Sequence, residues 1–326
     1  MSSGVAEGIR ISAIACSVPN NSVANDHFVS LLGTEQMAKF EKMVGVVQRR
    51  LAPDGMTTSS LAISAGRKLI EDGSFRPDTI DAVLFVSQTP DYVLPATACV
   101  VQSELGAGKS AIAFDINLGC SGFTYGVFVA ASLLKMEGVS KVLLCGGDVL
   151  SKIVDPADAA SAPLFGDAGF AAVVERDVSA PPMRYAMMTD GSGHAAIECR
   201  RGGFVSMNGM DVFNFAINEV PDLISREISA CGLSPDKIDF VVLHQANLYV
   251  LKQIALMTGF PMSKVPVSIY RYGNTSSASI PLTLCDMASP SVTKAKVLMC
   301  GFGVGLSWGA LLVDFDFSVC HPIVEL

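Results

Sequence analysis

The chain has 326 residues, of which 50% are hydrophobic and 17% charged, and its formal net charge is −8 at pH 7. The acidic balance excludes a typical nucleic-acid-binding protein, which carries a basic cluster. No stretch approaches the ~18 uninterrupted apolar residues of a membrane-spanning helix. The N-terminal MSSGVAEGIR contains no apolar core, so we expect no signal peptide, no membrane association and a cytoplasmic location.

Hydrophobic periodicity and turn residues predict alternating helices and strands along the chain. In the first half the pattern predicts, in order, a helix over 59–72, a strand over 80–87, a helix over 97–105, a strand over 110–116, a helix over 121–136 and a strand over 141–146. In the second half it predicts a helix over 211–231, a strand over 238–243, a helix over 248–257, a strand over 265–269, a helix over 276–287 and a strand over 296–299. Short apolar runs of this kind are typical of strands buried on both faces. The sequence therefore predicts a layered α/β protein with helices on both faces of its sheets.

Two sequence frames recur in the same order in the two halves. PDTIDAVLF at 77–85 matches PDKIDFVVL at 235–243 (235 − 77 = 158), and KVLLCG at 141–146 matches KVLMCG at 296–301 (296 − 141 = 155). Buried strands generally favour valine and leucine, which explains why the apolar residues of the two frames match. It does not explain the shared Pro-Asp and Cys-Gly positions. We therefore interpret the chain as two duplicated halves, 1–176 and 177–326, that pack as one body around an approximate two-fold axis.

Cys120 is one of nine cysteines, none of which forms a Cys-x-x-Cys pair, so neither a zinc ribbon nor a dithiol redox motif is supported. It lies between Gly119 and Gly122, where a predicted strand leads into a predicted helix. Unpaired N–H groups and the positive dipole end at a helix start favour a thiolate and lower the pKa of a thiol. Cys120 is thus a candidate nucleophile, and a buried structural cysteine is the alternative.

His244 and Asn274 lie in turns that follow predicted strands of the second half. Read alone, His244 also fits a core histidine bonded to backbone, and Asn274 also fits a helix N-cap. The repeat favours a shared site, because Asn274 lies 154 residues after Cys120 (274 − 120 = 154) and so occupies the equivalent turn. A cysteine thiolate that attacks the substrate, together with two hydrogen-bond donors for a developing enolate, suits a reaction of thioesters.

A glycine-rich segment, GFGVGLSWG at 301–309, joins two predicted strands near the end of the chain. It lacks the lysine and the following helix of a phosphate-binding loop, so we reject nucleotide binding. A backbone donor that approaches a thioester oxygen is the functional interpretation, and a tight hairpin is the alternative.

Seven motifs in chain order together resemble the thiolase superfamily and, within it, the β-ketoacyl-acyl-carrier-protein synthase III family. They are GCSGFTY at 119–125, DVL at 148–150, LFGDAG at 164–169, MNGMDVF at 207–213, HQANL at 244–248, GNTSSAS at 273–279 and the glycine-rich segment. The resemblance covers nearly the whole chain. It implies the five-layered αβαβα thiolase fold and a homodimer.

The resemblance also implies a reaction. Cys120 would take an acyl group from a thioester, while the backbone N–H groups of Cys120 and Val304 bind the oxyanion. A malonyl thioester would then lose CO₂, and its enolate, stabilised by His244 and Asn274, would attack the acyl group to give a β-ketoacyl thioester for fatty-acid or specialised acyl biosynthesis. The substrates would ride on coenzyme A or on the phosphopantetheine of acyl carrier protein, and no metal or redox cofactor would be needed.

Two positions differ from the family's fatty-acid enzymes. Tyr249 stands where these enzymes usually have the arginine that helps to dock the carrier protein, and the segment 40–50 lacks their tryptophan that stacks on adenine. We therefore take Tyr249, Lys252 and Phe213 as candidates for carrier docking or for the pocket, and a specialised pathway is as well supported as ordinary fatty-acid synthesis. A degradative thiolase and a non-catalytic or acyl-transfer partner subunit are the alternatives.

Overall fold

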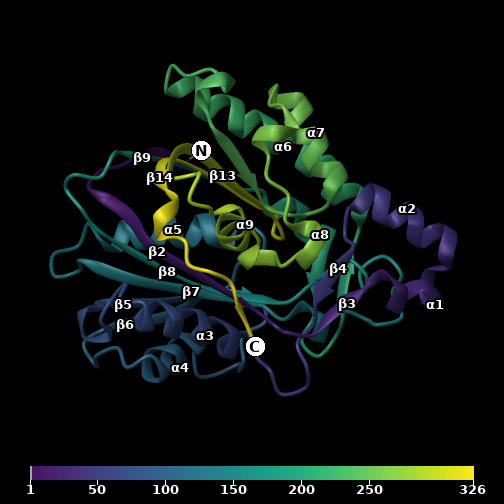
Figure 1. Cartoon of the computed structure of the whole chain (residues 1–326), viewed down its shortest axis with the longest axis horizontal. Helices are drawn as coiled ribbons and strands as arrows, with labels where there is room; N and C mark the ends of the chain where they lie inside the picture. The colour runs from purple at the N-terminus through teal and green to yellow at the C-terminus, as the bar shows by residue number, and fades with distance from the viewer. Residues whose placement is uncertain (1) are drawn as a thin grey trace.

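Two β-sheets lie one above the other with helices between and outside them, in a computed structural model that describes residues 2–326 (Figure 1). The first sheet has the strand order β15-β2-β8-β7-β5-β6 and comprises β2 (Ile9–Val18), β5 (Ala82–Val86), β6 (Ile112–Ile116), β7 (Lys141–Asp148), β8 (Ala168–Arg176) and β15 (Val324–Glu325). The second has the order β1-β9-β14-β13-β12 and comprises β1 (Ser2–Ala6), β9 (Met183–Thr189), β12 (Phe240–Leu243), β13 (Lys294–Gly303) and β14 (Ser307–Asp316).

Three layers of helices complete the fold (Figure 1). The outer helices α3 (Thr58–Glu71) and α4 (Thr97–Glu104) cover the first sheet, and α6 (Gly209–Ala230) and α7 (Leu248–Thr258) lie on the far side of the second. Between the sheets lie α5 (Gly122–Leu133) and α9 (Ser279–Met287). The predicted five-layered αβαβα fold is confirmed. Among residues 2–326, no helix combines the length and the apolar character needed to cross a membrane.

The strand orders show the duplication directly. Strands β2-β8-β7-β5 of the first sheet correspond to β9-β14-β13-β12 of the second. Both β5 and β12 follow a short 3₁₀ turn that begins at the repeated proline, Pro77–Thr79 and Pro235–Lys237. The division into 1–176 and 177–326 itself stays a prediction, and β1 from the start of the chain pairs with β9 in the second sheet.

The predicted strand over 265–269 is wrong. Its residues form no ladder, and Ile269 begins the short helix α8 (Ile269–Tyr272). Pro266 has no N–H to donate, and the side chain of Gln245 takes the place of a neighbouring strand. Its Oε1 accepts the N–H groups of Ser268 (3.0 Å) and Ile269 (3.3 Å), while its Nε2 donates to the carbonyls of Leu243 (2.9 Å) and Pro266 (3.4 Å).

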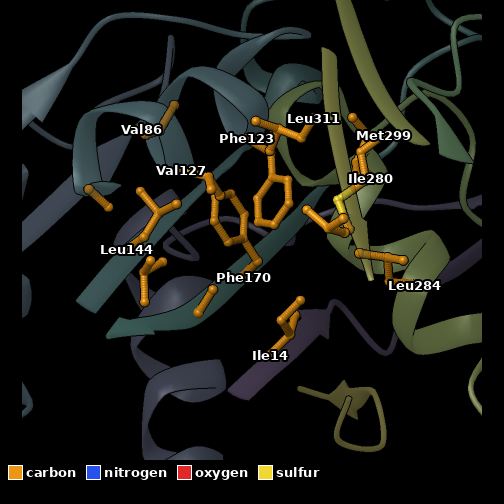
Figure 2. Close-up of a cluster of buried hydrophobic side chains, with 14 of the residues drawn as sticks. Ile14, Val86, Phe123, Val127, Leu144, Phe170, Ile280, Leu284, Met299 and Leu311 are labelled. Atoms are coloured by element: carbon orange, nitrogen blue, oxygen red, sulfur yellow. The ribbon is translucent and has the colours of Figure 1, made fainter. Parts of the chain in front are cut away.

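The main hydrophobic core fills the space between the two sheets. Figure 2 shows Phe123 of α5 beside Phe170 of β8, and their rings meet edge to face with centroids 5.5 Å apart. Ile280 and Leu284 of α9 lie near Met299 of β13 in the same cluster. Full burial of each such side chain stabilises the fold by roughly 1.5–3 kcal/mol. This core fixes the starts of α5 and α9, which carry the candidate site.

Candidate active site

Cys120 lies in the turn between β6 and α5, where the second half of the chain closes over it. An ideal Cβ built on Gly303 would stand 2.6 Å from the Cβ of Cys120 and 2.9 Å from its Sγ. Only a glycine backbone can approach this closely, so the glycine-rich segment packs against the thiol. Gly303 ends β13 and Ser307 begins β14, so the turn consists of 304–306 and contains Gly305. The other glycines of this segment lie in the strands, Gly301 and Gly303 in β13 and Gly309 in β14.

The expectation that the helix start lowers the pKa of Cys120 is wrong for this structure. Burial, and then the negative charge of Asp148, raise the pKa of Cys120 to about 12. Hydrogen bonds with the side chain of Ser276 and the backbone of Val304 act in the opposite direction. The helix itself begins at Gly122 with Ser121 as its N-cap, so the sulfur lies outside the first turn, where the dipole effect is concentrated. Cys120 therefore rests as a thiol.

His244 directly follows β12 and is 1% exposed. Its Nδ1 shares a hydrogen bond of 2.7 Å with Ser279 Oγ, and its ring meets Phe302 edge to face at 5.4 Å. Burial lowers the pKa of His244 to about 3, and a hydrogen bond with the backbone of Ser276 opposes the shift without reversing it. The imidazole is consequently neutral at physiological pH, with one ring N–H able to donate.

We expect the imidazole signal of His244 to stay constant between pH 5 and pH 8. The pKa of about 3 lies well below this range, whereas an unperturbed histidine titrates near 6.5. The measurement is NMR of the protein labelled with ¹³C at histidine Cε1, with His244 assigned from its missing peak in the His244→Ala variant. A midpoint between pH 5 and pH 8 would contradict the burial argument.

Asn274 lies between the two halves in a turn fixed by backbone hydrogen bonds. Its N–H donates to the carbonyl of Leu164 (3.0 Å), and its carbonyl accepts the N–H of Gly166 (3.0 Å). The side-chain Oδ1 accepts the N–H of Ser276 (3.0 Å), so a capping contact is present. This contact orients the amide and leaves its NH₂ group as the donor available to the site.

One cavity of ≈ 280 Å³ brings the predicted residues together. Cys120, His244, Asn274 and Val304 all line it. Most of its remaining wall is apolar and comes from Leu150, Ile153, Leu164, Phe165, Val205, Met207, Val212, Phe213, Ala216 and Val250. A cavity with a few convergent polar groups and a mainly apolar wall suits a small molecule with an aliphatic part.

The three candidates for docking or for the pocket take different places. Phe213 lines the cavity, whereas Tyr249 and Lys252 are not among its lining residues. Tyr249 is 44% exposed and stacks on Phe213 with ring centroids 5.5 Å apart and planes inclined by 19°. Lys252 lies exposed on α7, one turn further along. Tyr249 therefore extends the cavity wall toward the surface.

Asp148 and Ser276 also lie at the site, although the sequence motifs that contain them assigned neither residue a role. Asp148 ends β7 and is fully buried, and Ser276 has a φ of 51°, which is unusual for a residue other than glycine. The only signal for Asp148 in the sequence is an acidic residue at the end of an apolar strand. Ser276 is hidden in a run of small polar residues that also fits an ordinary turn.

Comparisons with known proteins agree with this arrangement. The family model for 3-oxoacyl-[acyl-carrier-protein (ACP)] synthase III matches residues 114–191, and the model for its C-terminal part matches residues 228–315. The chain is 34% identical to β-ketoacyl-[acyl-carrier-protein] synthase III 1 of Bacillus cereus over 307 residues, covering 93% of this chain and 97% of that protein. It is 36% identical to the corresponding synthase III of a Staphylococcus epidermidis strain over 312 residues, covering 94% and 99%.

Solved structures give the same result. The 3-oxoacyl-(acyl-carrier protein) synthase of Burkholderia xenovorans LB400 superimposes with a TM-score of 0.96 at 35% identity, covering 100% of this chain and 99% of that one. The priming β-ketosynthase of the R1128 polyketide biosynthetic pathway superimposes with a TM-score of 0.87 at 27% identity, covering 95% and 97%. The chain belongs to the 3-oxoacyl-[acyl-carrier-protein] synthase III family of thiolase-fold condensing enzymes.

Proposed function

We propose that this enzyme condenses an acyl group held on Cys120 with a malonyl thioester, with release of CO₂, to give a β-ketoacyl thioester. One observation carries the assignment of roles: a nucleophilic thiol, a neutral imidazole and a fixed amide line the same cavity. Thiol, imidazole and amide supply a covalent acyl carrier and two neutral donors for an enolate oxygen.

In the first half-reaction Cys120 attacks the carbonyl of the donor thioester. The oxyanion that forms needs donors close to the sulfur. The backbone N–H groups of Cys120 and Val304 are the groups we assign to it, since Val304 lines the cavity with Cys120 and directly follows Gly303, which packs against the sulfur. A backbone donor depends little on its side chain, so valine at position 304 is compatible with this role.

In the second half-reaction loss of CO₂ from the malonyl thioester places negative charge on the thioester oxygen. Neutral His244 and the NH₂ group of Asn274 donate to that oxygen, and the carbanion attacks the acyl carbon on Cys120. The hydrogen bond with Ser279 holds the imidazole in place, and Ser276 holds the amide. Donors fixed before the charge appears need no reorganisation during the step.

Intact-protein mass spectrometry after incubation with a panel of acyl thioesters tests this function. We expect one acyl group to add to the wild-type protein and none to the Cys120→Ala variant. Addition of a malonyl thioester is then expected to remove the adduct and release a β-ketoacyl product. Absence of an adduct with every donor would overturn the proposal and favour a non-catalytic partner subunit.

The carrier of each substrate is part of the proposal. Relatives are named for acyl carrier protein, and we propose coenzyme A or carrier-protein thioesters as substrates here. With Tyr249 in place of the family's usual arginine, the mouth of the cavity lacks a positive charge that an acidic carrier protein would need.

We expect Tyr249→Arg to lower the KM for an acyl carrier protein by about two- to fivefold, the effect of one exposed ion pair. Steady-state kinetics with the same acyl group on coenzyme A provides the control, and an equal change in both KM values would contradict docking by this residue.

We also propose that the enzyme is a homodimer. Within residues 2–326, β6 forms one edge of the first sheet and pairs with the single strand β5. Ile112 at its start is 43% exposed, and Val93 and Leu94 in the loop after β5 are 78% and 80% exposed. An open edge with apolar neighbours favours pairing with a second copy.

Sedimentation is expected to show a dimer for the wild type and a shift toward monomer for Ile112→Asp. An unchanged dimer in the variant would assign the interface elsewhere.

A degradative thiolase fits the site less well. Such an enzyme would need a second thiol at the cavity, but Cys300 is fully buried in β13, and burial raises the pKa of its thiol. Cys300 does not line the cavity. The absence of a cofactor and the cytoplasmic location stay predictions.

A further inference from the structure

Two buried serines connect the turn that carries Cys120 to the turn that carries Val304. Ser121 Oγ lies 2.7 Å from Ser307 Oγ, and Ser307 Oγ donates a hydrogen bond to the carbonyl of Val304 (2.8 Å). Both serine side chains are buried, although they are 186 residues apart in the sequence. Ser121 is the N-cap of α5 and Ser307 begins β14, so their contact joins two elements that meet beside the sulfur. We call this chain of hydrogen bonds the serine link.

The direction of the serine link follows from the hydrogens that are available. A serine hydroxyl has one hydrogen to donate. Ser307 uses its hydrogen for the carbonyl of Val304, so the hydrogen between the two serines comes from Ser121. The link therefore runs from Ser121 through Ser307 to the backbone of Val304, and both buried hydroxyl groups are satisfied, as is usual for buried polar groups.

Close packing of the backbone limits how near the two turns can approach each other. An ideal Cβ built on Gly301 would stand 2.8 Å from the Cα of Ser121 and 2.9 Å from the carbonyl oxygen of Cys120. A Cβ on Gly303 would stand 2.6 Å from the Cβ of Cys120. Strand β13 thus lies directly against the nucleophile turn, and steric repulsion prevents a shorter separation. Repulsion alone does not stop the turns from moving apart, and the serine link supplies the opposing attraction.

The separation of these turns affects the reaction because each turn carries one donor assigned to the oxyanion. The N–H groups of Cys120 and Val304 must both lie about 2.7–3.1 Å from the same oxygen. Each end of the serine link is held in a rigid element. Thr124 Oγ1 donates to the carbonyl of Ser121 (2.8 Å) at the start of α5, and Ser307 pairs with strand residues on both sides. A change in the link would therefore change the spacing of the two donors.

We propose that Ser121 and Ser307 are positioning residues that set the spacing of the two oxyanion donors during acylation of Cys120, a role that rests on the function proposed above. Neither serine is among the lining residues of the cavity, so they act through the backbone of the turns. Ser121→Ala removes the link between the turns but leaves the hydrogen bond from Ser307 to Val304 in place. Ser307→Ala removes both hydrogen bonds.

Acylation and alkylation of Cys120, measured side by side, test this role. Rapid-quench mass spectrometry would follow acylation by acetyl-coenzyme A and octanoyl-coenzyme A. Alkylation by iodoacetamide displaces iodide from a saturated carbon and forms no oxyanion on a carbonyl carbon. It would be followed on the peptide that contains Cys120, because Cys99 and Cys199 are exposed thiols as well.

We expect Ser121→Ala to acylate about tenfold more slowly than wild type, because one oxyanion donor is displaced, whereas complete loss of a donor costs about 10²–10³-fold. Ser307→Ala is expected to lose about 10²-fold, the effect of a displacement of roughly 1 Å. Both variants should be alkylated at the wild-type rate. The donor concentration that gives half the maximal acylation rate should change by less than about twofold, because the affected interaction is made in the transition state.

Ser268 and Thr283 provide a matched control. Their hydroxyl groups are also buried and 2.7 Å apart, and Thr283 Oγ1 donates to the carbonyl of Ser279 (2.7 Å). Ser268→Ala therefore removes an equivalent hydrogen bond and should keep the wild-type acylation rate while losing a similar amount of stability in chemical denaturation. Ser307→Thr should acylate within about threefold of wild type, because threonine supplies the same donor and acceptor.

Three results would overturn the role of the serine link and leave the proposed function intact. They are a wild-type acylation rate in Ser121→Ala, equal losses of acylation in Ser121→Ala and Ser268→Ala, and equal losses of acylation and alkylation in Ser121→Ala, which would mean that the thiol itself had changed. Alkylation of wild-type Cys120 without acylation by any donor would overturn the proposed function and the serine link with it.

Discussion

Replacing His244 or Asn274 with alanine is expected to stop carbon–carbon bond formation while acyl transfer to Cys120 continues. Both side chains act on the malonyl thioester, and the oxyanion donors of the first half-reaction are backbone groups that alanine leaves in place. Loss of one fixed donor to a developing oxyanion lowers a rate by about 10²–10³-fold. We expect a loss of this size in CO₂ release for each variant.

The measurement pairs the mass of acyl-Cys120 with release of ¹⁴CO₂ from a malonyl thioester labelled at its carboxyl carbon. Asn274→Asp is the matched control, because it keeps the shape and the oxygen that accepts from Ser276 but loses the NH₂ donor. It should fail at decarboxylation as Asn274→Ala does. A variant that released CO₂ normally and lost acylation would contradict the assigned roles.

Gly303→Ala is expected to lower the acylation rate of Cys120 by about 10²-fold, the effect of misplacing a reacting group by roughly 1 Å. The new Cβ would stand 2.6 Å from the Cβ of Cys120 and 2.9 Å from Sγ, and both separations are too short for non-bonded atoms. Either the thiol or the turn that carries the Val304 N–H must move. Overpacking of this kind also costs about 1–3 kcal/mol in the free energy of unfolding.

Rapid-quench acylation and chemical denaturation would measure the two effects of Gly303→Ala. Gly191→Ala serves as the control, because a Cβ at Gly191 meets no heavy atom within 4 Å; its acylation rate should match the wild type. A wild-type acylation rate in Gly303→Ala would show that the thiol does not depend on this close contact.

Sequence patterns predicted the elements whose burial is regular. The apolar runs before Cys120 and His244 are strands β6 and β12, and the repeat correctly indicated that Cys120, His244 and Asn274 line one cavity. Periodicity succeeds for β12 because helices cover both faces of its sheet, which makes the strand uniformly apolar. Strand β6 is a partly exposed edge strand that includes Asp115, and its remaining apolar residues were enough to predict it.

The two wrong predictions, the strand over 265–269 and the lowered pKa of Cys120, have physical causes that hydrophobic periodicity does not contain. The segment 265–269 has the composition of a strand, but its N–H groups bond to the side chain of Gln245. The pKa of Cys120 depends on burial and on Asp148, whose effect appears only when β7 and the start of α5 lie side by side. Asp148 itself is held by donors 60 and 129 residues away along the chain, a separation that no local pattern encodes.

The side chain of Gln245 has a consequence for assembly. A duplicated chain with an open strand at the edge of each sheet could add copies at both ends and grow into a filament. Among residues 2–326 the second sheet ends at β12, with no strand in the place that β6 takes in the first sheet, and Gln245 ties 266–269 to the last carbonyl of β12. In the homodimer proposed above, β6 would supply the edge for pairing, while the engaged carbonyl at the end of β12 would disfavour addition of a further copy at that strand.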